Sequence, residues 1–437
     1  MNSARAFWRH MVVGAAALGV LAVPSDAWAQ SAEIEPANVA WVLTASALVL
    51  FMTLPGLALF YGGLVRMKNV LSTMMQCVAI TCVVSLLWLA VGYSLAFDGD
   101  APWIGGLTKA FLPPTAAEGA IFGLPEPVFF LFQLTFAVIT PALIVGAFVE
   151  RIKFQAVVAL SALWLLLVYA PVAHWVWGGG WLAQNGVLDF AGGLVVHATA
   201  GASALVIAAM LGPRDGFPAA THPPHSPGMT MIGAGMLWVG WYGFNGGSAL
   251  AANADAATAI IATHMSASAA AIAWCAIEWL RFKRPSLIGA VTGAVAGLAT
   301  VTPASGFIGP LGGAALGLAG GVVCFFAVDI VKRKLKIDDS LDVFAVHGVG
   351  GVLGTLLLAA FCSAEAGGIG YREGYDFSTQ LGAQALGVAA VLGYSAIVTA
   401  LIVLAVKALL GLRAAEEHIR DGLDLSHHGE RAQPDTP

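Results

Sequence analysis

Long apolar stretches, separated by short charged segments, limit what this chain can fold into. A bilayer core about 30 Å thick is crossed by a helix of about 20 apolar residues, and eleven stretches come close to or exceed that length. Their approximate ranges are 38–64, 69–96, 127–149, 154–177, 190–211, 229–251, 255–280, 286–303, 307–331, 343–362 and 380–410. Only 10% of the residues are charged, against about 25% in soluble domains. We therefore predict an all-α integral membrane protein with eleven transmembrane helices.

The distribution of lysine and arginine predicts how these helices are oriented. Positive charge gathers in loops on the inner side of a membrane. If the mature N-terminus lies outside, the inner loops and the C-terminal end carry 16 of the 20 Lys and Arg residues, and the outer loops carry two. The other two, Arg5 and Arg9, precede the first apolar run. We expect an outer N-terminus and an inner C-terminus, and no basic block indicates a nucleic-acid partner.

The first residues have the layout of a secretory signal peptide. An apolar run over 11–23 follows two arginines, and "AWA" at 27–29 offers a small-x-small cleavage site. An uncleaved first helix is the alternative, but the run is too short to span a bilayer. The predicted domains are a cleaved signal peptide over 1–29, a membrane domain over 30–411 and a cytoplasmic tail over 412–437.

Two histidines lie deep in apolar helices that run in opposite directions. His197 follows Asp189 by eight residues, which places it roughly 12 Å into the fifth helix. His347 enters the tenth helix from the other side, five residues after Asp342. This arrangement predicts two inverted five-helix repeats, helices 1–5 and 6–10, with a site between them and a peripheral eleventh helix. Either histidine alone is compatible with a hydrogen-bonded packing role, but ionisable groups at bilayer depth tend to mark pathways.

Aromatic residues and a hydroxyl gather toward the expected outer mouth. Trp177 ends the fourth helix, Ser248 lies near the outer end of the sixth, and Phe244 lies one turn deeper on the same face. Phe136 lies about three turns down the third helix. Such a set can attract a cation, because aromatic faces bind cations. An interfacial aromatic belt remains the alternative.

Five motifs in order resemble the ammonium transporter branch of the Amt/Rhesus family. They are "GAFVERIKF", "DFAGGLVVH", "WYGFNGGSA", "VTPASGFIGP" and "DVFAVHGVGG", and the resemblance covers about residues 35 to 430. It implies a homotrimer of eleven-helix subunits in a bacterial cytoplasmic (inner) membrane. It also implies no enzyme activity, no cofactor and no metal. The substrate would be ammonium or ammonia, with methylammonium as a further candidate, and the tail would receive a PII-type signal protein.

The resemblance also implies a role for individual residues. The expected set is Trp177, Ser248 and Phe136 for ammonium recruitment, Phe136 and Phe244 for a phenylalanine gate, His197 and His347 as twin pore histidines, Asp189 for organising the site, and Trp241 for lining the pore. Ammonium would lose its proton near the gate, and ammonia would pass the histidines. The sequence leaves open whether the proton also crosses.

Three other functions stay open at this point. The chain can be an ammonium sensor that signals through its tail with little flux, a haem protein whose two histidines bind iron, or a Rhesus-type pore for carbon dioxide or methylamine. The five cysteines lie in apolar segments at no metal-like spacing. His264, in the seventh helix, is expected to pack inside the bundle.

Overall fold

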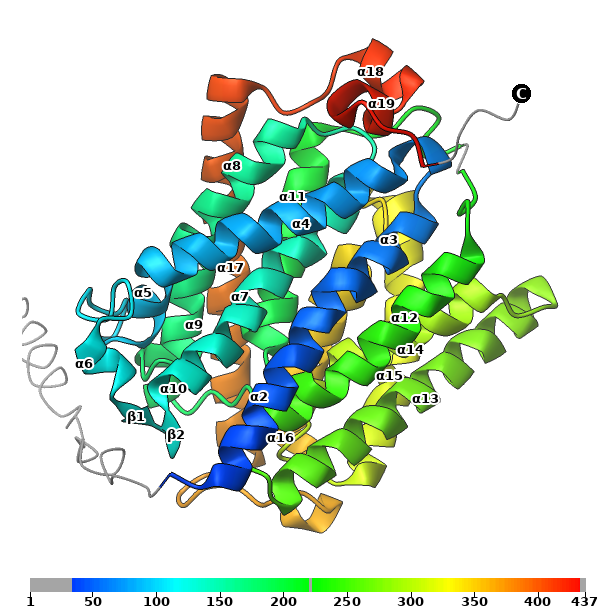
Figure 1. Ribbon diagram of the computed structural model, residues 1–437. Helices are drawn as coiled ribbons and strands as arrows, with labels where there is room; N and C mark the ends of the chain where they lie inside the picture. Colours follow the sequence, from blue (N-terminus) through cyan, green and yellow to red (C-terminus); the bar gives the residue numbers. More distant parts are fainter. Residues whose placement is uncertain (1–33, 220–221, 433–437) are drawn as a thin grey trace, which may run out of the picture.

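The computed structural model describes residues 34–219 and 222–432 as a bundle of long helices (Figure 1). The predicted signal peptide lies outside the described residues. Within them, nine helices are long and apolar enough to cross a membrane. They are Pro36–Leu64, Met67–Phe97, Glu126–Phe148, Phe154–Gln184, Gly193–Leu211, Ala254–Phe282, Pro310–Lys334, Phe344–Phe361 and Phe377–Leu410.

Two shorter helices occupy the remaining predicted positions. They are α12 (Pro227–Trp241), which continues into the π-helical turn η7 (Tyr242–Gly246), and α14 (Leu287–Val301). Each of the eleven predicted ranges thus contains a helix, with ends that differ by a few residues. The number of membrane crossings and their orientation stay predictions.

Several of the long helices are built from α-helical segments joined by π-helical turns. In the first half the segments are α2 (Pro36–Phe51), η2 (Met52–Leu57), α3 (Ala58–Leu64), α4 (Val70–Leu87), η4 (Trp88–Gly92), α5 (Tyr93–Phe97), α7 (Glu126–Phe148), α8 (Phe154–Trp164), η5 (Leu165–Tyr169), α9 (Ala170–Val176), α10 (Trp181–Gln184), η6 (Gly193–Ala198) and α11 (Thr199–Leu211). Later segments are α13 (Ala254–Phe282), α15 (Pro310–Asp329), η8 (Ile330–Lys334), η9 (Phe344–Gly348), α16 (Val349–Phe361) and α17 (Phe377–Leu410). Pro55 lies inside η2, where its missing N–H interrupts the α-helical ladder.

The remaining elements are short and lie in the connections. They are η3 (Met67–Asn69), α6 (Pro114–Ala117), the antiparallel strands β1 (Ala120–Ile121) and β2 (Leu124–Pro125), η10 (Ala364–Ala366), α18 (Glu416–Asp421) and α19 (Leu423–His428). Among the helices of the second half, α13 packs closely on α14 and α15. Gly317 of α15 permits this approach, because a Cβ there would lie 2.2 Å from the carbonyl oxygen of Ser266.

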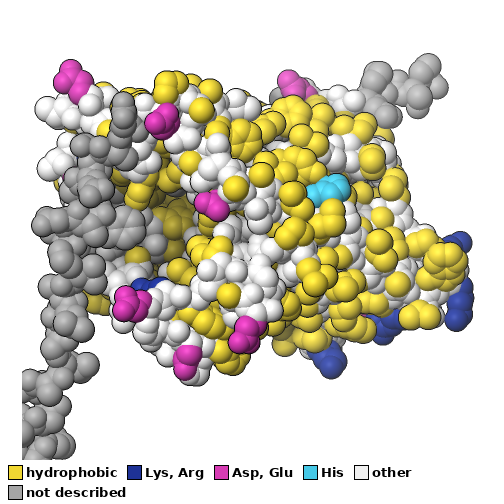
Figure 2. Space-filling model, turned by 90° about the horizontal axis from the view of Figure 1, so that it is seen from below, with side chains coloured by type: hydrophobic (Ala, Val, Ile, Leu, Met, Phe, Trp, Pro, Cys, Tyr) yellow, Lys and Arg dark blue, Asp and Glu magenta, His cyan; other side chains and the backbone are white. Residues whose placement is uncertain are grey.

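The segment after α17 folds back onto one end of the bundle, which we call the tail end. The backbone N–H of Leu423 donates to Asn69 Oδ1 at 2.9 Å, and the N–H of Ser72 donates to Asp424 Oδ1 at 2.7 Å. A β-bridge joins Ile152 to Arg413. The opposite end, which we call the Asp189 end, shows scattered carboxylates, with lysine and arginine mainly at its margin (Figure 2).

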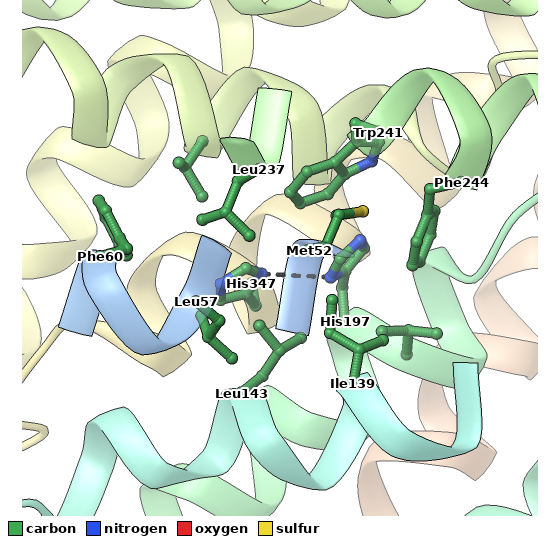
Figure 3. Close-up of a pocket in the computed structure, with 12 residues that line it drawn as sticks. Met52, Leu57, Phe60, Ile139, Leu143, His197, Leu237, Trp241, Phe244 and His347 are labelled. Carbon is green, nitrogen blue, oxygen red and sulfur yellow. Dashed lines mark hydrogen bonds between the residues drawn. The ribbon is translucent and has the colours of Figure 1, made fainter. Parts of the chain in front are cut away.

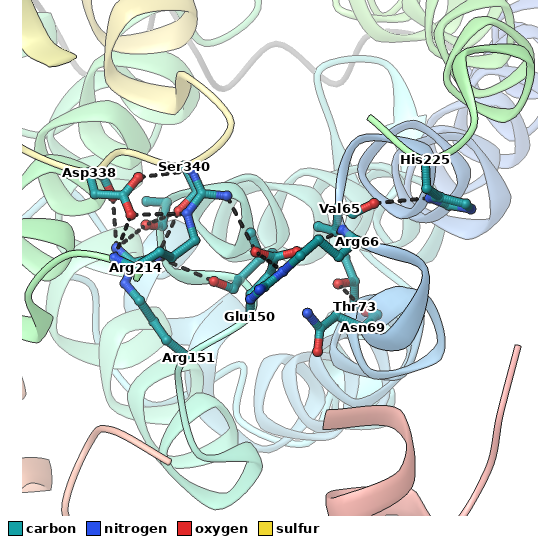
Figure 4. Close-up of polar contacts among 12 residues, drawn as sticks. Val65, Arg66, Asn69, Thr73, Glu150, Arg151, Arg214, His225, Asp338 and Ser340 are labelled. Carbon is teal, nitrogen blue, oxygen red and sulfur yellow. Dashed lines mark hydrogen bonds and ion pairs between the residues drawn. The ribbon is translucent and has the colours of Figure 1, made fainter. Parts of the chain in front are cut away.

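A buried ionic network ties the loops together at the tail end (Figure 4). Glu150 lies 3.1 Å from Arg66 Nε and 3.5 Å from an Arg214 amino group, and Arg214 makes two 2.9 Å bonds to Asp338. Burial raises the pKa of the Glu150 carboxyl, but Arg214 and Arg66 outweigh it and hold the pKa below its ordinary value. The guanidinium of Arg151, fully buried beside them, donates to backbone carbonyls and to a serine hydroxyl. Charge of this kind is tolerated in the interior because it is paired and hydrogen-bonded.

Candidate functional site

The structure brings His197 and His347 into direct contact at the centre of the bundle. Their Nδ1 atoms lie 3.2 Å apart, and the rings stack with centroids 5.2 Å apart and planes 21° from parallel. Each ring is carried by a π-helical turn, η6 for His197 and η9 for His347. The two histidine helices cross at glycines, because a Cβ on Gly201 would lie 2.3 Å from the Cα of Gly348. Small residues at this crossing therefore set the distance between the imidazoles.

A narrow apolar cavity lies beside the two histidines. Its volume is about 10 Å³, which holds about one water-sized molecule. The lining residues are Met52, Leu57, Phe60, Ile139, Leu143, Val196, His197, Leu237, Trp241, Phe244, Val295 and His347. Within this lining, Phe244 lies at one end of the cavity and Phe60 at the other, with the two imidazoles between them (Figure 3). Apart from the imidazoles, the cavity is lined by apolar and aromatic side chains, so it suits a small neutral molecule better than a hydrated ion.

A column of aromatic rings leads from the Asp189 end to the histidines. Trp177 meets Phe136 edge-to-face at 5.7 Å, and Phe136 lies over Phe244 with centroids 4.3 Å apart. Phe244 is followed by His197 at 6.0 Å, and Trp241 stacks on the same imidazole at 5.5 Å. Trp177 is part-exposed, whereas the two phenylalanines are each 1% exposed. The phenylalanine pair thus separates the accessible tryptophan from the buried histidines.

Ser248 and Trp241 each have a defined hydrogen-bond partner. The Ser248 hydroxyl donates to the carbonyl of Phe244 at 2.8 Å. Its proton is used in this way, so the oxygen lone pairs of this part-exposed residue stay available to accept from a donor. The indole N–H of Trp241 donates to Thr302 Oγ1 at 2.9 Å, which leaves the ring face toward His197.

Asp189 caps the turn that carries His197. One carboxylate oxygen accepts the backbone N–H groups of Gly192 and Gly193, and the other accepts those of Leu194 and Val195, at 2.6 to 3.1 Å. The first N–H groups of a helix have no partner within it, and here one carboxylate satisfies four of them. The carbonyl of Asp189 also accepts the indole N–H of Trp177 at 2.8 Å. Asp189 therefore joins the aromatic column to the histidine turn.

The acidic residue that caps the second histidine turn is Asp339 and not Asp342, the nearer aspartate in the sequence, with which we had paired His347. Asp339 is fully buried and accepts the N–H of Phe344 at 2.7 Å, while Asp342 makes an ion pair with Lys332 at 2.7 Å. Asp339 precedes His347 by eight residues, the same spacing that separates Asp189 from His197. This repeated spacing was the signal in the sequence that could have identified it.

Two further expectations, for His264 and for a haem iron, can be compared with the structure. His264 does not pack inside the bundle; it is exposed on α13, with Nδ1 2.7 Å from the hydroxyl of Tyr242. The contact between His197 and His347 leaves no space for an iron between the rings, since a metal–nitrogen bond alone is about 2.0 Å. Within residues 34–219 and 222–432, no group of three His, Cys, Asp or Glu residues is placed to hold a metal.

Sequence comparison matches nearly the whole helical region to one family. The sequence profile of the Ammonium Transporter Family matches residues 40–433. The chain is 46% identical over 410 residues to an ammonium transporter of Aquifex aeolicus, covering 93% of this chain and 96% of the relative. It is 44% identical over 394 residues to an ammonium transporter of Bacillus subtilis, covering 89% and 97%.

Solved structures give the same result for the fold. A protein described as Sensor Amt Protein superposes with a TM-score of 0.84 at 31% identity, covering 90% of this chain and 98% of the other. The crystal structure of Candida albicans Mep2 superposes with a TM-score of 0.81 at 35% identity, covering 88% of each chain. The likeness in fold to these two structures therefore covers about nine tenths of the chain.

Proposed function

We propose that this chain recruits ammonium at the Asp189 end, removes its proton and conducts ammonia past His197 and His347. The chain is a multi-pass membrane protein and belongs to the ammonium transporter family. The observation that carries the proposal is the continuous series of rings from Trp177 through the phenylalanine pair to the two imidazoles. The Asp189 end is taken as the outer side, as the distribution of positive charge predicts.

Recruitment relies on aromatic faces and one hydroxyl. Trp177 and Phe136 present ring faces, which attract a cation by about 2 kcal/mol when it is desolvated. The free lone pairs of Ser248 accept an N–H of ammonium, a contact that potassium lacks because it carries no proton. We assign Trp177, Ser248 and Phe136 to recruitment, and Phe136 with Phe244 to the gate beneath.

Loss of the proton is the cheaper way past the gate. The cavity is too small and too apolar for a hydrated cation, and burial of an isolated charge costs many kcal/mol, more than a few ring contacts offset. Releasing the proton from ammonium near neutral pH costs about 3 kcal/mol, from about two pK units at 1.36 kcal/mol each. The neutral molecule that results matches the cavity beside His197.

The imidazoles supply the polar groups that ammonia needs in an apolar passage. In the described part of the chain, His197 Nε2 has no hydrogen-bond partner, so it is free to bond a passing molecule. The Nδ1 atoms of His197 and His347 share one hydrogen bond, which also links the rings for proton transfer. Whether that transfer occurs decides if uptake is electrogenic. Moving one net charge across the membrane is worth about 2.3 kcal/mol per 100 mV of membrane potential.

The assembly and regulation carried over from the family are part of the same proposal. We assign the chain to a homotrimer in a bacterial cytoplasmic membrane, with the tail as the docking site of a PII-type signal protein. The tail is well placed for such a role because Leu423 and Asp424 bond directly to Asn69 and Ser72, at the start of α4. A partner that pulls on the tail would therefore act on this end of α4.

A sensor with little flux is the second candidate. The structural neighbour described as Sensor Amt Protein has the same fold at a TM-score of 0.84, so the fold by itself fits either activity. A sensor would bind ammonium at the aromatic mouth and move the tail. Binding without flux in purified protein would favour this alternative.

The experiment is a current measurement on reconstituted protein. Wild type, His197→Ala and the control His222→Ala, which changes an exposed loop histidine, are placed in proteoliposomes and given jumps of ammonium or potassium. We expect ammonium-dependent transport in wild type and in the control, and its loss or loss of selectivity in His197→Ala. A simultaneous internal pH record separates electrogenic transport from passage of ammonia alone. Unchanged selective flux in His197→Ala would refute the proposed pathway.

A further inference from the structure

The loop that leads into Asp189 is held by two side chains of α17. The side-chain amide of Gln384 accepts the N–H of Leu188 at 2.8 Å and donates to the carbonyl of the same residue at 2.7 Å. It also donates to the carbonyl of Thr355 at 3.2 Å. Gln384 thus fixes both backbone groups of the residue directly before Asp189 and ties them to α16.

A second glutamine on the same face of α17 extends this clamp. The Gln380 amide donates to the carbonyl of Gly186 at 3.1 Å and to Gln384 Oε1 at 3.1 Å. Residues four apart lie on one face of a helix, so the two amides hold the loop at neighbouring points. Gln380 is 1% exposed and Gln384 fully buried. Buried amides in an apolar environment are costly unless hydrogen-bonded, which favours a fixed arrangement here.

The clamp connects directly to the groups of the candidate site. Asp189 follows Leu188, its carbonyl accepts the indole N–H of Trp177, and its carboxylate caps the turn that carries His197. A shift of the Leu188 backbone would therefore move Trp177 and the cap together. At this end of the aromatic column, Trp177 is bonded to Asp189 itself, whereas Phe136 meets Trp177 and Phe244 through ring contacts.

We propose that Gln384, supported by Gln380, is a positioning residue of the outer ammonium site. It does not touch the substrate; it sets Asp189 and, through Asp189, the ring of Trp177. This inference rests on the proposed recruitment function. A misplacement of about 1 Å in a binding group is enough to change rates up to about a hundredfold, so loss of the clamp should be visible in the apparent affinity for ammonium.

The test compares two substitutions on the same helix. Gln384→Leu keeps the size of the side chain and removes its bonds to the loop. Thr399→Val is the control: it removes a buried hydroxyl of α17 that bonds to Ser203 and Trp164, about 22 Å from Gln384 along the helix. We expect Gln384→Leu to raise the KM for ammonium about tenfold, with the maximal rate kept within about twofold. Thr399→Val should leave KM within about twofold of wild type.

A conservative variant, Gln384→Glu, keeps the inference testable if Gln384→Leu does not fold. In Gln384→Glu, a protonated carboxyl accepts from the Leu188 N–H and donates to its carbonyl, whereas the ionised form has no donor. The ratio of the Gln384→Glu KM to the wild-type KM should therefore fall toward one as the assay pH is lowered. A ratio that stays well above one at every pH, or an equal KM change in folded Gln384→Leu and Thr399→Val, would overturn the inference.

A Ser248→Ala measurement separates this inference from the function on which it rests. A raised KM in Ser248→Ala with wild-type KM in Gln384→Leu would reject the positioning role and keep the recruitment site. Wild-type KM in Ser248→Ala would reject the recruitment site itself. A raised KM in both variants, with Thr399→Val unchanged, would support both proposals.

Discussion

Removal of the Asp189 carboxylate should destabilise the protein in proportion to the backbone groups it leaves unbonded. Asp189→Ala orphans four buried N–H groups, those of residues 192–195. Asp189→Asn keeps one oxygen and turns an NH₂ group toward the other two donors, so it orphans two. An unsatisfied buried donor costs about 1–3 kcal/mol. We expect a loss of about 4 kcal/mol or more for Ala and about half of that for Asn.

The assay is the free energy of unfolding in detergent micelles, measured without ammonium. Asp376→Ala is the control, because Asp376 is an exposed cap whose carboxylate bonds to Thr379 at the start of α17, and loss of such a cap costs about 1 kcal/mol. Wild-type stability in Asp189→Ala together with lost transport would refute the reasoning. That result would mean that the carboxylate acts on the substrate and contributes little to the fold.

Two further predictions concern the second histidine turn and the crossing of the histidine helices. Burial raises the pKa of Asp339 to about 7, so the stability that it contributes is full below about pH 4 and is lost as the pH rises through about 7. Asp339→Asn should therefore flatten the dependence of the unfolding midpoint on pH between about 4 and 8, and an unchanged dependence in this variant would contradict the prediction. Gly351→Ala would place a Cβ 2.8 Å from that of His197 and should cost about 1–3 kcal/mol and slow ammonium flux. Gly393→Ala, with open space around it, is the matched control, and equal flux in both would contradict this account of the crossing.

The apolar pattern of the sequence predicted most of the fold. A helix that must satisfy its own backbone in lipid needs a continuous apolar stretch, so each stretch marked one helix to within a few residues. The π-helical turns that carry the site residues were not readable in this way, because each is only five or six residues long and leaves no periodic pattern of its own. Three of these turns carry Phe244, His197 and His347. Backbone turns that the apolar pattern did not predict therefore position three residues of the candidate site.

The candidate residues were found because a histidine or an aspartate stands out in an apolar helix. Their contacts were not predictable in the same way. Pairing His347 with Asp342 followed nearness in the sequence, whereas the capping geometry depends on which carboxylate the loop turns inward, and that is Asp339. His264 was expected inside for a similar reason, because a sequence does not say which face of an alanine-rich helix points outward.

The sequence by itself determined the membrane setting, the positions of the helices, the residue types available to the site and the family. Composition and the order of motifs are properties of the chain, so no coordinates were needed for them. Only the tertiary structure decided that the imidazoles touch, that the aromatic rings form one column, and that Gln384 holds the loop before Asp189. Each of these joins segments up to 196 residues apart, and contacts over such distances depend on how helices pack, through the glycine crossings and buried polar bonds that fix one helix against another.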